Sequence, residues 1–386
     1  MLRAIELAKQ GLGWTNPNPL VGAVIVKNGR IIGEGYHRKC GELHAERNAI
    51  ASLTESAEGA TLYVTLEPCC HYGKTPPCTE AILEQKIARV VIGSRDPNPL
   101  VAGKGAAILR AAGVEVEEDF MREECDALNP VFFHYITKKT PYVVMKYAMT
   151  ADGKIAARTG DSKWITGEKA REKVQEMRHA YMGIMVGIGT VLADDPILNV
   201  RIPGKKSPVR IICDSRLRIP VDSQIVKTAK EYRTIVAYAG ETAGESAAQA
   251  SPGNLSSGGF LQTAAEFDKK LEQLHAAGVE TISVPDAYGR VDLKKLMEYL
   301  GKQGIDSILL EGGGTLNDAA LTAEIVNEIC VFIAPKIFGG ARAKTPVAGI
   351  GVAHPPEAVK MTLKDVQKIG DDLMLRYDVD DRKEVE

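Results

Sequence analysis

The chain of 386 residues has little excess charge of either sign and no long apolar run. Its formal net charge of −2 gives no general attraction to nucleic acid or to an anionic membrane. The absence of any run of about 18 apolar residues predicts that no transmembrane helix forms. Glu6 and Lys9 interrupt the amphipathic start, which is therefore unlike a secretory signal. We expect a cytoplasmic protein that binds neither nucleic acid nor membrane.

The sequence also lacks the cysteine pattern of a secreted disulfide framework. Its seven cysteines are an odd number, and Cys69 and Cys70 are adjacent. Such thiols indicate a reducing compartment, where they are available to a metal. At this length we expect two domains. The polar, proline-terminated segment 137–141 predicts a boundary that separates residues 1–140 from residues 141–386.

The most informative residues are in His44-Ala45-Glu46 and in the segment from Pro68 to Cys78. A catalytic zinc is held by three protein ligands and keeps one open position for water. His44, Cys69 and Cys78 supply three such ligands, which leaves Glu46 free to move protons. The order H-x-E followed by P-C is typical of zinc deaminases, although the usual second cysteine comes three residues after the first. Cys70 competes with Cys69, but the Pro-Cys pairing favours Cys69.

Two less specific interpretations stay open at this point. Cys40, spaced like a zinc-finger ligand, could complete a closed structural site with the same three residues. A closed site would give Glu46 no task. Alternatively, the cysteines are simply buried and hold no metal.

Hydrophobic periodicity predicts an α/β first half. Strands and helices alternate, which indicates a mainly parallel sheet with helices on both faces. His44 and Glu46 are two residues apart, so they converge only if His44 lies at the frayed start of its helix. We expect helices at 2–12, 44–57, 78–85 and 105–112 and another through Tyr135, with strands at 21–26, 30–36, 61–66, 89–93 and 114–116.

Several polar residues in this half are candidates for substrate contacts. Asn18 lies at a strand entry, where its amide could read a base edge or simply form a turn. His71, Lys74 and Thr75 surround a flexible glycine and suit a phosphate, or else form a solvated loop.

The second half repeats the alternation, with strands at 142–149, 183–187, 209–213, 279–284 and 307–310 and a helix at 168–181. The Ala/Gly/Ser-rich segment 238–265 is interpreted as a loosely ordered insertion without chemistry. Glu311-Gly-Gly-Gly-Thr-Leu-Asn317 follows a strand and precedes a helix, where backbone N–H groups can approach a phosphate, or it is a plain turn. It is not the G-x-G-x-x-G fingerprint. Arg178 and Arg201 are either substrate-phosphate ligands or surface ion pairs.

Taken together, these motifs resemble the bifunctional riboflavin-biosynthesis deaminase–reductases of bacteria. The resemblance covers nearly the whole chain apart from the insertion. It depends on the zinc motifs above together with Arg95-Asp-Pro-Asn-Pro-Leu-Val-Ala-Gly103, Asp152-Gly-Lys-Ile155, Gly160-Asp-Ser-Lys-Trp-Ile-Thr166 and Glu311-Gly-Gly-Gly314.

The resemblance implies an α/β fold with a cytidine-deaminase-like α/β/α domain followed by a dihydrofolate-reductase-like α/β domain. The first would use a zinc-activated hydroxide to deaminate 2,5-diamino-6-ribosylamino-4(3H)-pyrimidinone 5′-phosphate. The second would use NADPH to reduce the ribosyl side chain to ribityl. Reductases of this type commonly pair, so a homo-oligomer through the reductase domain is expected.

The resemblance also implies roles for residues of the second half. Lys146 would assist the reaction electrostatically. The residues expected to line NADPH are Ala148, Trp164, Thr190, Asp194, Ser215, Gly313, Gly314, Thr315, Leu316, Asn317, Asp318 and Ala319. Those expected to hold the substrate are Ser162, Arg178, Leu198, Arg201 and Glu311.

Two rival functions remain for comparison. A deaminase acting on tRNA adenosine shares H-x-E but would need a basic face, which the balanced charge does not favour. A zinc-stabilised binding module could have a second half that only senses a nucleotide. Release of ammonia together with consumption of NADPH distinguishes the predicted enzyme from both.

Overall fold

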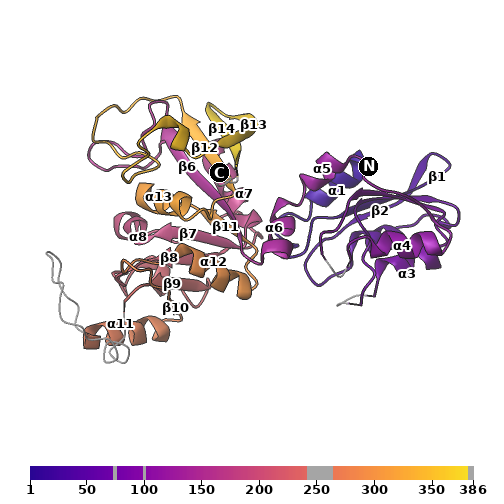
Figure 1. The fold of residues 1–386 in the computed structure, drawn as a ribbon, viewed down its shortest axis with the longest axis horizontal. Helices are drawn as coiled ribbons and strands as arrows, with labels where there is room; N and C mark the ends of the chain where they lie inside the picture. The colour runs from indigo at the N-terminus through magenta and orange to yellow at the C-terminus, as the bar shows by residue number, and fades with distance from the viewer. Residues whose placement is uncertain (73–75, 99–100, 241–263, 381–386) are drawn as a thin grey trace. The chain divides into compact units, whose positions relative to one another are not determined.

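The computed structural model describes residues 1–72, 76–98, 101–240 and 264–380. Lys74, Thr75 and nearly all of the Ala/Gly/Ser-rich insertion lie outside these ranges. The chain divides into two compact units, Met1–Pro141 and Tyr142–Glu386 (Figure 1). No helix in the described ranges is both long enough and apolar enough to cross a membrane.

The first unit is a five-stranded sheet with the order β2-β1-β3-β4-β5. Its elements are α1 (Leu2–Lys9), β1 (Gly22–Lys27), β2 (Arg30–Tyr36), α2 (Ala45–Ala51), β3 (Thr61–Leu66), α3 (Cys78–Glu84), β4 (Arg89–Ser94), α4 (Lys104–Ala111), β5 (Glu115–Glu117), α5 (Arg122–Asp126) and α6 (Pro130–Lys138).

This sheet is mixed, so the prediction of a mainly parallel sheet is wrong for the first unit. β1 pairs antiparallel with both β2 and β3, whereas β3–β4 and β4–β5 are parallel. The crossover through α2 makes β3 parallel to β2, but β3 is added beside β1, which runs the other way. The helical connections were therefore enough to predict the direction of each strand, but they did not predict which strands lie side by side in the sheet.

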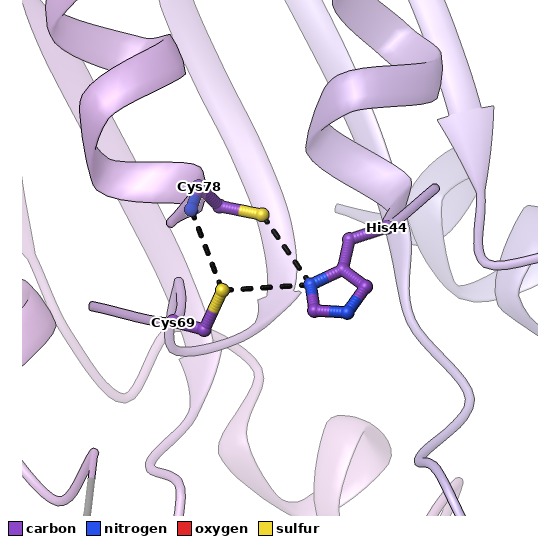
Figure 2. A group of neighbouring side chains, drawn as sticks. All are labelled: His44, Cys69 and Cys78. Carbon is purple, nitrogen blue, oxygen red and sulfur yellow. Dashed lines mark hydrogen bonds between the residues drawn. The ribbon is translucent and has the colours of Figure 1, made fainter. Parts of the chain in front are cut away.

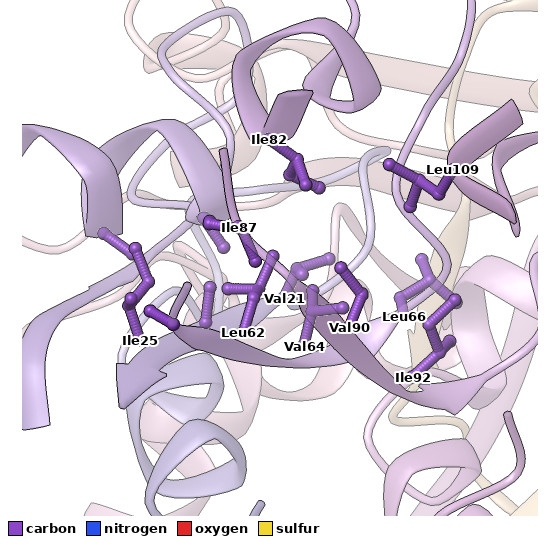
Figure 3. Packing of buried hydrophobic residues seen from close by; sticks show 14 of the residues in the cluster. Val21, Ile25, Leu62, Val64, Leu66, Ile82, Ile87, Val90, Ile92 and Leu109 are labelled. Atoms are coloured by element: carbon purple, nitrogen blue, oxygen red, sulfur yellow. The ribbon is translucent and has the colours of Figure 1, made fainter. Parts of the chain in front are cut away.

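Alternation along β1 divides the core between the two faces of the sheet. Ile25 packs with Leu62 and Ile82 on the face covered by α3 and α4, as Figure 3 shows. Val24 points to the other face and packs against Leu7 of α1. The unit is thus an α/β/α sandwich, which follows from the period of two in a strand that is buried on both faces.

Three expected helices end or divide differently from the prediction. The first ends at Lys9 rather than residue 12, and α2 ends at Ala51 rather than residue 57. Ser52 terminates α2 because its hydroxyl lies 2.9 Å from the carbonyl oxygens of both Ala49 and Glu34. The helix expected through Tyr135 is two helices, since Pro130 cannot continue α5 and instead begins α6.

The second unit is a nine-stranded sheet with the order β10-β9-β8-β7-β11-β6-β12-β14-β13. Its elements are β6 (Tyr142–Thr150), α7 (Glu168–Ala180), β7 (Gly183–Gly187), α8 (Ile188–Asp194), β8 (Val209–Cys213), α9 (Gln224–Lys227), β9 (Thr234–Tyr238), α11 (Ala264–Ala276), β10 (Glu280–Ser283), α12 (Leu293–Lys302), β11 (Ser307–Leu310), α13 (Gly314–Thr322), β12 (Glu328–Ala334), η1 (Pro355–Glu357), β13 (Met361–Ile369) and β14 (Asp372–Val379).

Helices cover both faces of this sheet. Alternating residues of β7 show the division, because Met185 packs with the cluster of α12 and α13 while Ile184 and Val186 pack with that of α8, α9 and α11. The strands from β10 to β12 are parallel, and β14 and β13 add as an antiparallel hairpin at one edge. The sequence interpretation missed this hairpin, together with β9 and β12.

Candidate active sites

Three segments bring potential metal ligands together in the first unit (Figure 2). His44 immediately precedes α2, Cys69 lies in the loop after β3, and Cys78 is the first residue of α3. Their ligand atoms all lie within 4.8 Å of one another. The three residues that the sequence predicted as zinc ligands are therefore neighbours in the fold.

The spacing of these atoms suits zinc. His44 Nδ1 lies 3.5 Å from both Cys69 Sγ and Cys78 Sγ. A tetrahedral ion with Zn–S of about 2.3 Å and Zn–N of about 2.0 Å would separate nitrogen from sulfur by about 3.5 Å. Cys40 does not belong to this group among the described residues, so the closed four-ligand alternative gains no support.

The start of α2 places Glu46 beside the ligands. His44 has φ −70° and ψ 165°, so it is extended and the helix begins at Ala45. This confirms that His44 lies at the start of its helix, outside the regular turns. Glu46 is then in the first turn, is 3 % exposed, and shares a pocket wall with His44 and Cys69.

Electrostatics suit proton transfer by Glu46. Burial raises the pKa of its carboxyl to about 6, and the Cys69 thiolate adds to the effect. Hydrogen bonding to Cys78 and to His44 keeps the pKa of the Cys69 thiol well below its usual range. The backbone N–H of Cys78 donates to Cys69 Sγ at 3.4 Å. These groups can therefore hold a cation beside a carboxyl that exchanges protons near neutral pH.

A pocket of about 460 Å³ opens beside the ligands. Asn18 and His71, both predicted to contact substrate, line it. The sequence interpretation missed His37, Glu67 and Asp96, which also line the pocket. A signal existed for Asp96, because it follows the carboxyl end of β4, the parallel neighbour of the strand that leads to Cys69.

Two of the missed carboxyl groups differ in their surroundings. Glu67 accepts hydrogen bonds from the backbone N–H groups of Gly103, at 2.9 Å, and Ala106, at 3.2 Å, and so ties α4 to the turn before Cys69. Asp96 is 8 % exposed, and burial raises the pKa of its carboxyl to about 6. Both carboxylates are tied to the backbone, because Asp96 Oδ1 also accepts a hydrogen bond from Asn98 N–H at 2.8 Å.

The second unit collects its candidate residues at one edge of its sheet. Carboxyl ends of neighbouring parallel strands meet at the same edge, and ligands of such sheets bind there. β8, β7, β11 and β6 are consecutive neighbours. Predicted site residues just after the ends of these strands are Ser215, Thr190, Glu311 and the segment that begins at Gly313. Ala148 lies within β6, and Asp194 is the last residue of α8.

Two of the residues predicted to contact the substrate, Arg178 and Glu311, form an ion pair at this edge. Arg178 donates to Glu311 through Nε at 2.8 Å and Nη2 at 3.0 Å, and through Nη1 to Asn199 O at 3.2 Å. Burial opposes ionisation of Glu311, but Arg178 and Lys146 outweigh it and hold the pKa of its carboxyl at about 2. The pair is largely buried, so it is not the surface ion pair considered from sequence.

The remaining candidates lie in two loops. Leu198 is buried, and Arg201 follows it with its backbone N–H donating to Gln175 Oε1 at 2.9 Å. Trp164 is 65 % exposed, with the Arg171 guanidinium 4.2 Å from its ring centroid. Ser162, two residues before Trp164, is half-buried. No hydrogen bond or ion pair joins these loops to Lys146 among the described residues, but Arg201 lies near enough to Glu311 to help lower the pKa of that carboxyl.

Comparison with known proteins agrees with these geometries. The model of the cytidine and deoxycytidylate deaminase zinc-binding region matches residues 1–94, and that of the RibD C-terminal domain matches residues 141–375. The riboflavin biosynthesis protein RibD of Actinobacillus pleuropneumoniae is 56 % identical over 377 residues, which cover 98 % of this chain and 94 % of that protein. The chain belongs to the RibD family.

Solved RibD structures have the same fold. The chain matches a RibD from Acinetobacter baumannii with a TM-score of 0.82 at 36 % identity, covering 98 % of this chain and 97 % of the other. It matches a Thermotoga maritima protein with a TM-score of 0.82 at 39 % identity and the same coverage. That protein is described as a diaminohydroxyphosphoribosylaminopyrimidine deaminase/5-amino-6-(5-phosphoribosylamino)uracil reductase.

These findings confirm the predicted fold class and activity. As a RibD protein, the chain is a bifunctional deaminase and reductase of riboflavin biosynthesis. Its first unit is cytidine-deaminase-like with a zinc-binding region, and its second contains the RibD C-terminal domain. Both rival functions considered from sequence are therefore set aside.

The ligand set leads to a prediction about zinc content. Cys78→Ser should lose zinc, because a direct ligand contributes more than the roughly 10–100-fold in affinity that an outer-shell partner contributes. Cys40→Ser is the matched control and should keep zinc, since Cys40 lies outside the ligand group. Metal analysis after dialysis measures both variants. Zinc lost equally from both would revive the four-ligand site.

Proposed function

We propose that the unit formed by residues 1–140 removes the amino group from 2,5-diamino-6-ribosylamino-4(3H)-pyrimidinone 5′-phosphate by hydrolysis. The observation that carries this proposal is the buried Glu46 beside His44, Cys69 and Cys78 in one pocket. The description of the Thermotoga maritima relative names a phosphoribosylaminopyrimidine deaminase, which supports this substrate class.

Glu46 performs the proton transfers in this proposal. His44, Cys69 and Cys78 would hold zinc, which when bound acts as a Lewis acid that makes water acidic near neutral pH. Glu46 would take one proton from the attacking water and deliver it to the ring nitrogen, and would then move the second proton of the same oxygen to the amino group, which leaves as ammonia. Burial raises the pKa of the Glu46 carboxyl, which makes it a stronger base than an exposed glutamate.

The pocket would hold the pyrimidine and direct its phosphate outward. Asn18 and His71 line the pocket and would contact the substrate. Lys74 and Thr75, which lie outside the described residues, remain proposed phosphate ligands because an ammonium and a hydroxyl suit that group.

Removal of the proposed proton carrier tests this step. Glu46→Gln should lower the rate of ammonia release by about 10²–10⁴-fold, since an amide cannot accept and return the proton. Zinc content and reductase activity should stay at wild-type values. Glu84→Gln is the control, because Glu84 is an exposed carboxylate of the same unit that does not line the pocket. Undiminished ammonia release from Glu46→Gln would contradict the proposal.

We also propose that residues 141–386 reduce the ribosyl side chain to ribityl with NADPH. When bound, NADPH supplies the hydride. Lys146, whose pKa burial lowers, would act electrostatically near the reacting carbon. The proposed cofactor contacts are those grouped at the carboxyl edge of β6, β7, β8 and β11, with Trp164: Ala148, Thr190, Asp194, Ser215, Gly313, Gly314, Thr315, Leu316, Asn317, Asp318 and Ala319.

The two candidate arginines take different roles in this proposal. All three guanidinium nitrogens of Arg178 are engaged by Glu311 and the backbone, so Arg178 orients Glu311. The exposed guanidinium of Arg201 has no hydrogen bond or ion pair among the described residues, and it is therefore the proposed phosphate ligand. Ser162 and Leu198 complete the proposed substrate contacts.

Substitution of Arg201 distinguishes substrate from cofactor binding. Arg201→Ala should raise the KM for the deaminated pyrimidine by roughly 10–100-fold, since a charge-assisted hydrogen bond to phosphate is lost. The Kd for NADPH should not change. Lys302→Ala is the control and should leave both values unchanged, because Lys302 is an exposed cation at the end of α12, before the start of β11. A change in NADPH affinity without a change in KM would refute this placement.

We propose that the protein forms a homo-oligomer through the second unit. β13 is the edge strand of the nine-stranded sheet, so its outer backbone groups are unpaired within the sheet. Apolar side chains on this hairpin are exposed, with Leu363 54 %, Val366 51 % and Leu373 43 % accessible. A long apolar edge of this kind is a typical surface for association with a second copy.

The mass of the protein in solution tests this surface. The double substitution of Leu363→Lys and Val366→Lys should convert the oligomer into monomer in light scattering, because two ammonium groups would be buried at the interface. Lys294→Ala, an exposed substitution elsewhere in the unit, is the control. An oligomer unaffected by the double substitution, or a monomeric wild type, would contradict the proposal.

The location proposed is the cytoplasm. All seven cysteines are free thiols, which is typical of proteins in a reducing compartment. Zinc ligation by Cys69 and Cys78 also requires that these thiols stay reduced.

A further inference from the structure

His37 and Asn18 form a hydrogen-bonded pair in the wall of the deaminase pocket. The Asn18 Nδ2 atom lies 3.2 Å from His37 Nε2, and both residues line the pocket. The backbone of the pair is also fixed, because Asn18 N–H donates to Thr15 O at 2.7 Å and His37 N–H donates to Val21 O at 2.9 Å. The side chains therefore meet from two anchored segments.

The tautomer of His37 follows from its other neighbour. His37 Nδ1 lies 3.0 Å from the carbonyl oxygen of Leu43. A carbonyl oxygen can only accept, so Nδ1 carries the hydrogen. His37 is 2 % exposed, and no carboxylate of the described residues forms a hydrogen bond with it. Burial of an imidazolium without such a partner is costly. Nε2 is therefore an acceptor.

An accepting Nε2 determines which end of the Asn18 amide faces His37. The amide must turn its NH₂ group to the ring, since two acceptors would repel each other. Asn18 Oδ1 is then left over, and it has no hydrogen-bond partner among the described residues. Because Asn18 lines the pocket, this oxygen is the group that a ligand meets.

We propose that His37 is a positioning residue that fixes the Asn18 amide with its carbonyl oxygen toward an N–H donor on the pyrimidine ring. The inference rests on the proposed deaminase function and adds a selection rule to it. A ring that presents an N–H group to Asn18 Oδ1 is bound. A ring that presents an oxygen or an unprotonated nitrogen there is rejected, because two acceptors then face each other.

A purely structural role is the alternative, because Leu43 immediately precedes the ligand His44. The His37 and His44 ring centroids are 5.4 Å apart. His37 could therefore serve only to hold the turn before His44. The two roles use different nitrogens of the same ring, so two amide substitutions separate them.

The experiment measures ammonia release, zinc content and reductase activity for His37→Asn, His37→Gln, Asn18→Leu and the double variant of Asn18→Leu with His37→Asn. In His37→Asn, the asparagine amide can replace the hydrogen bond from Nδ1 to Leu43, but it is too short to reach Asn18. Glutamine can place an accepting oxygen where Nε2 was, but leaves Leu43 without its donor. Reductase activity of the same chain reports that each variant is folded.

The proposal predicts that His37→Asn raises the KM for deamination by about tenfold with zinc retained, and that His37→Gln raises it less. The double variant should match Asn18→Leu alone, since the histidine acts only through the amide.

A larger increase in KM for His37→Gln than for His37→Asn would overturn the proposal, as would an unchanged KM in both variants. Zinc loss from His37→Asn, or effects on KM that multiply in the double variant, would also overturn it. Wild-type protein that releases no ammonia would instead refute the proposed deaminase function.

Discussion

The first unit depends on three ligand atoms being held within 4.8 Å of one another by three separate segments. Each segment is fixed by a different device. His44 has an extended backbone and immediately precedes α2. The Glu67 carboxylate joins the turn before Cys69 to α4 by hydrogen bonds. Cys78 is the first residue of α3. Because two of the three ligands are soft thiols, the cluster favours zinc over harder cations. The same α2 start that positions the imidazole also buries Glu46 beside it.

In the second unit, charged side chains gather at the carboxyl edge of the parallel strands. Two cationic side chains, Arg178 and Lys146, lie close to one buried carboxylate, Glu311. The bidentate pair with Arg178 keeps Glu311 ionised, and Lys146 forms no ion pair with a carboxylate in the part of the chain that the structure describes. A ligand that binds at this edge therefore meets two positive charges and one negative charge. No side chain in the described ranges caps the start of α13 at Gly313, where backbone N–H groups can bind an anion.

The amino-acid sequence predicted elements and motifs better than it predicted neighbours. His44, Glu46 and the two cysteines were identified because metal ligation requires particular residue types in a recognisable order. His37, Glu67 and Asp96 were missed because their roles depend on which loops meet across the sheet. The mixed strand order in the first unit escaped prediction for the same reason. The β13–β14 hairpin escaped it because β13 is exposed along nearly its whole length and therefore gives no buried pattern.

The coordination of bound zinc tests the central claim most directly. X-ray absorption at the zinc edge of the wild-type protein resolves sulfur from nitrogen or oxygen neighbours by their different distances, about 2.3 Å against about 2.0–2.2 Å. The account predicts two sulfur neighbours, one imidazole nitrogen and one further light atom from solvent. A shell of three sulfurs and one imidazole, with no solvent position, would contradict it.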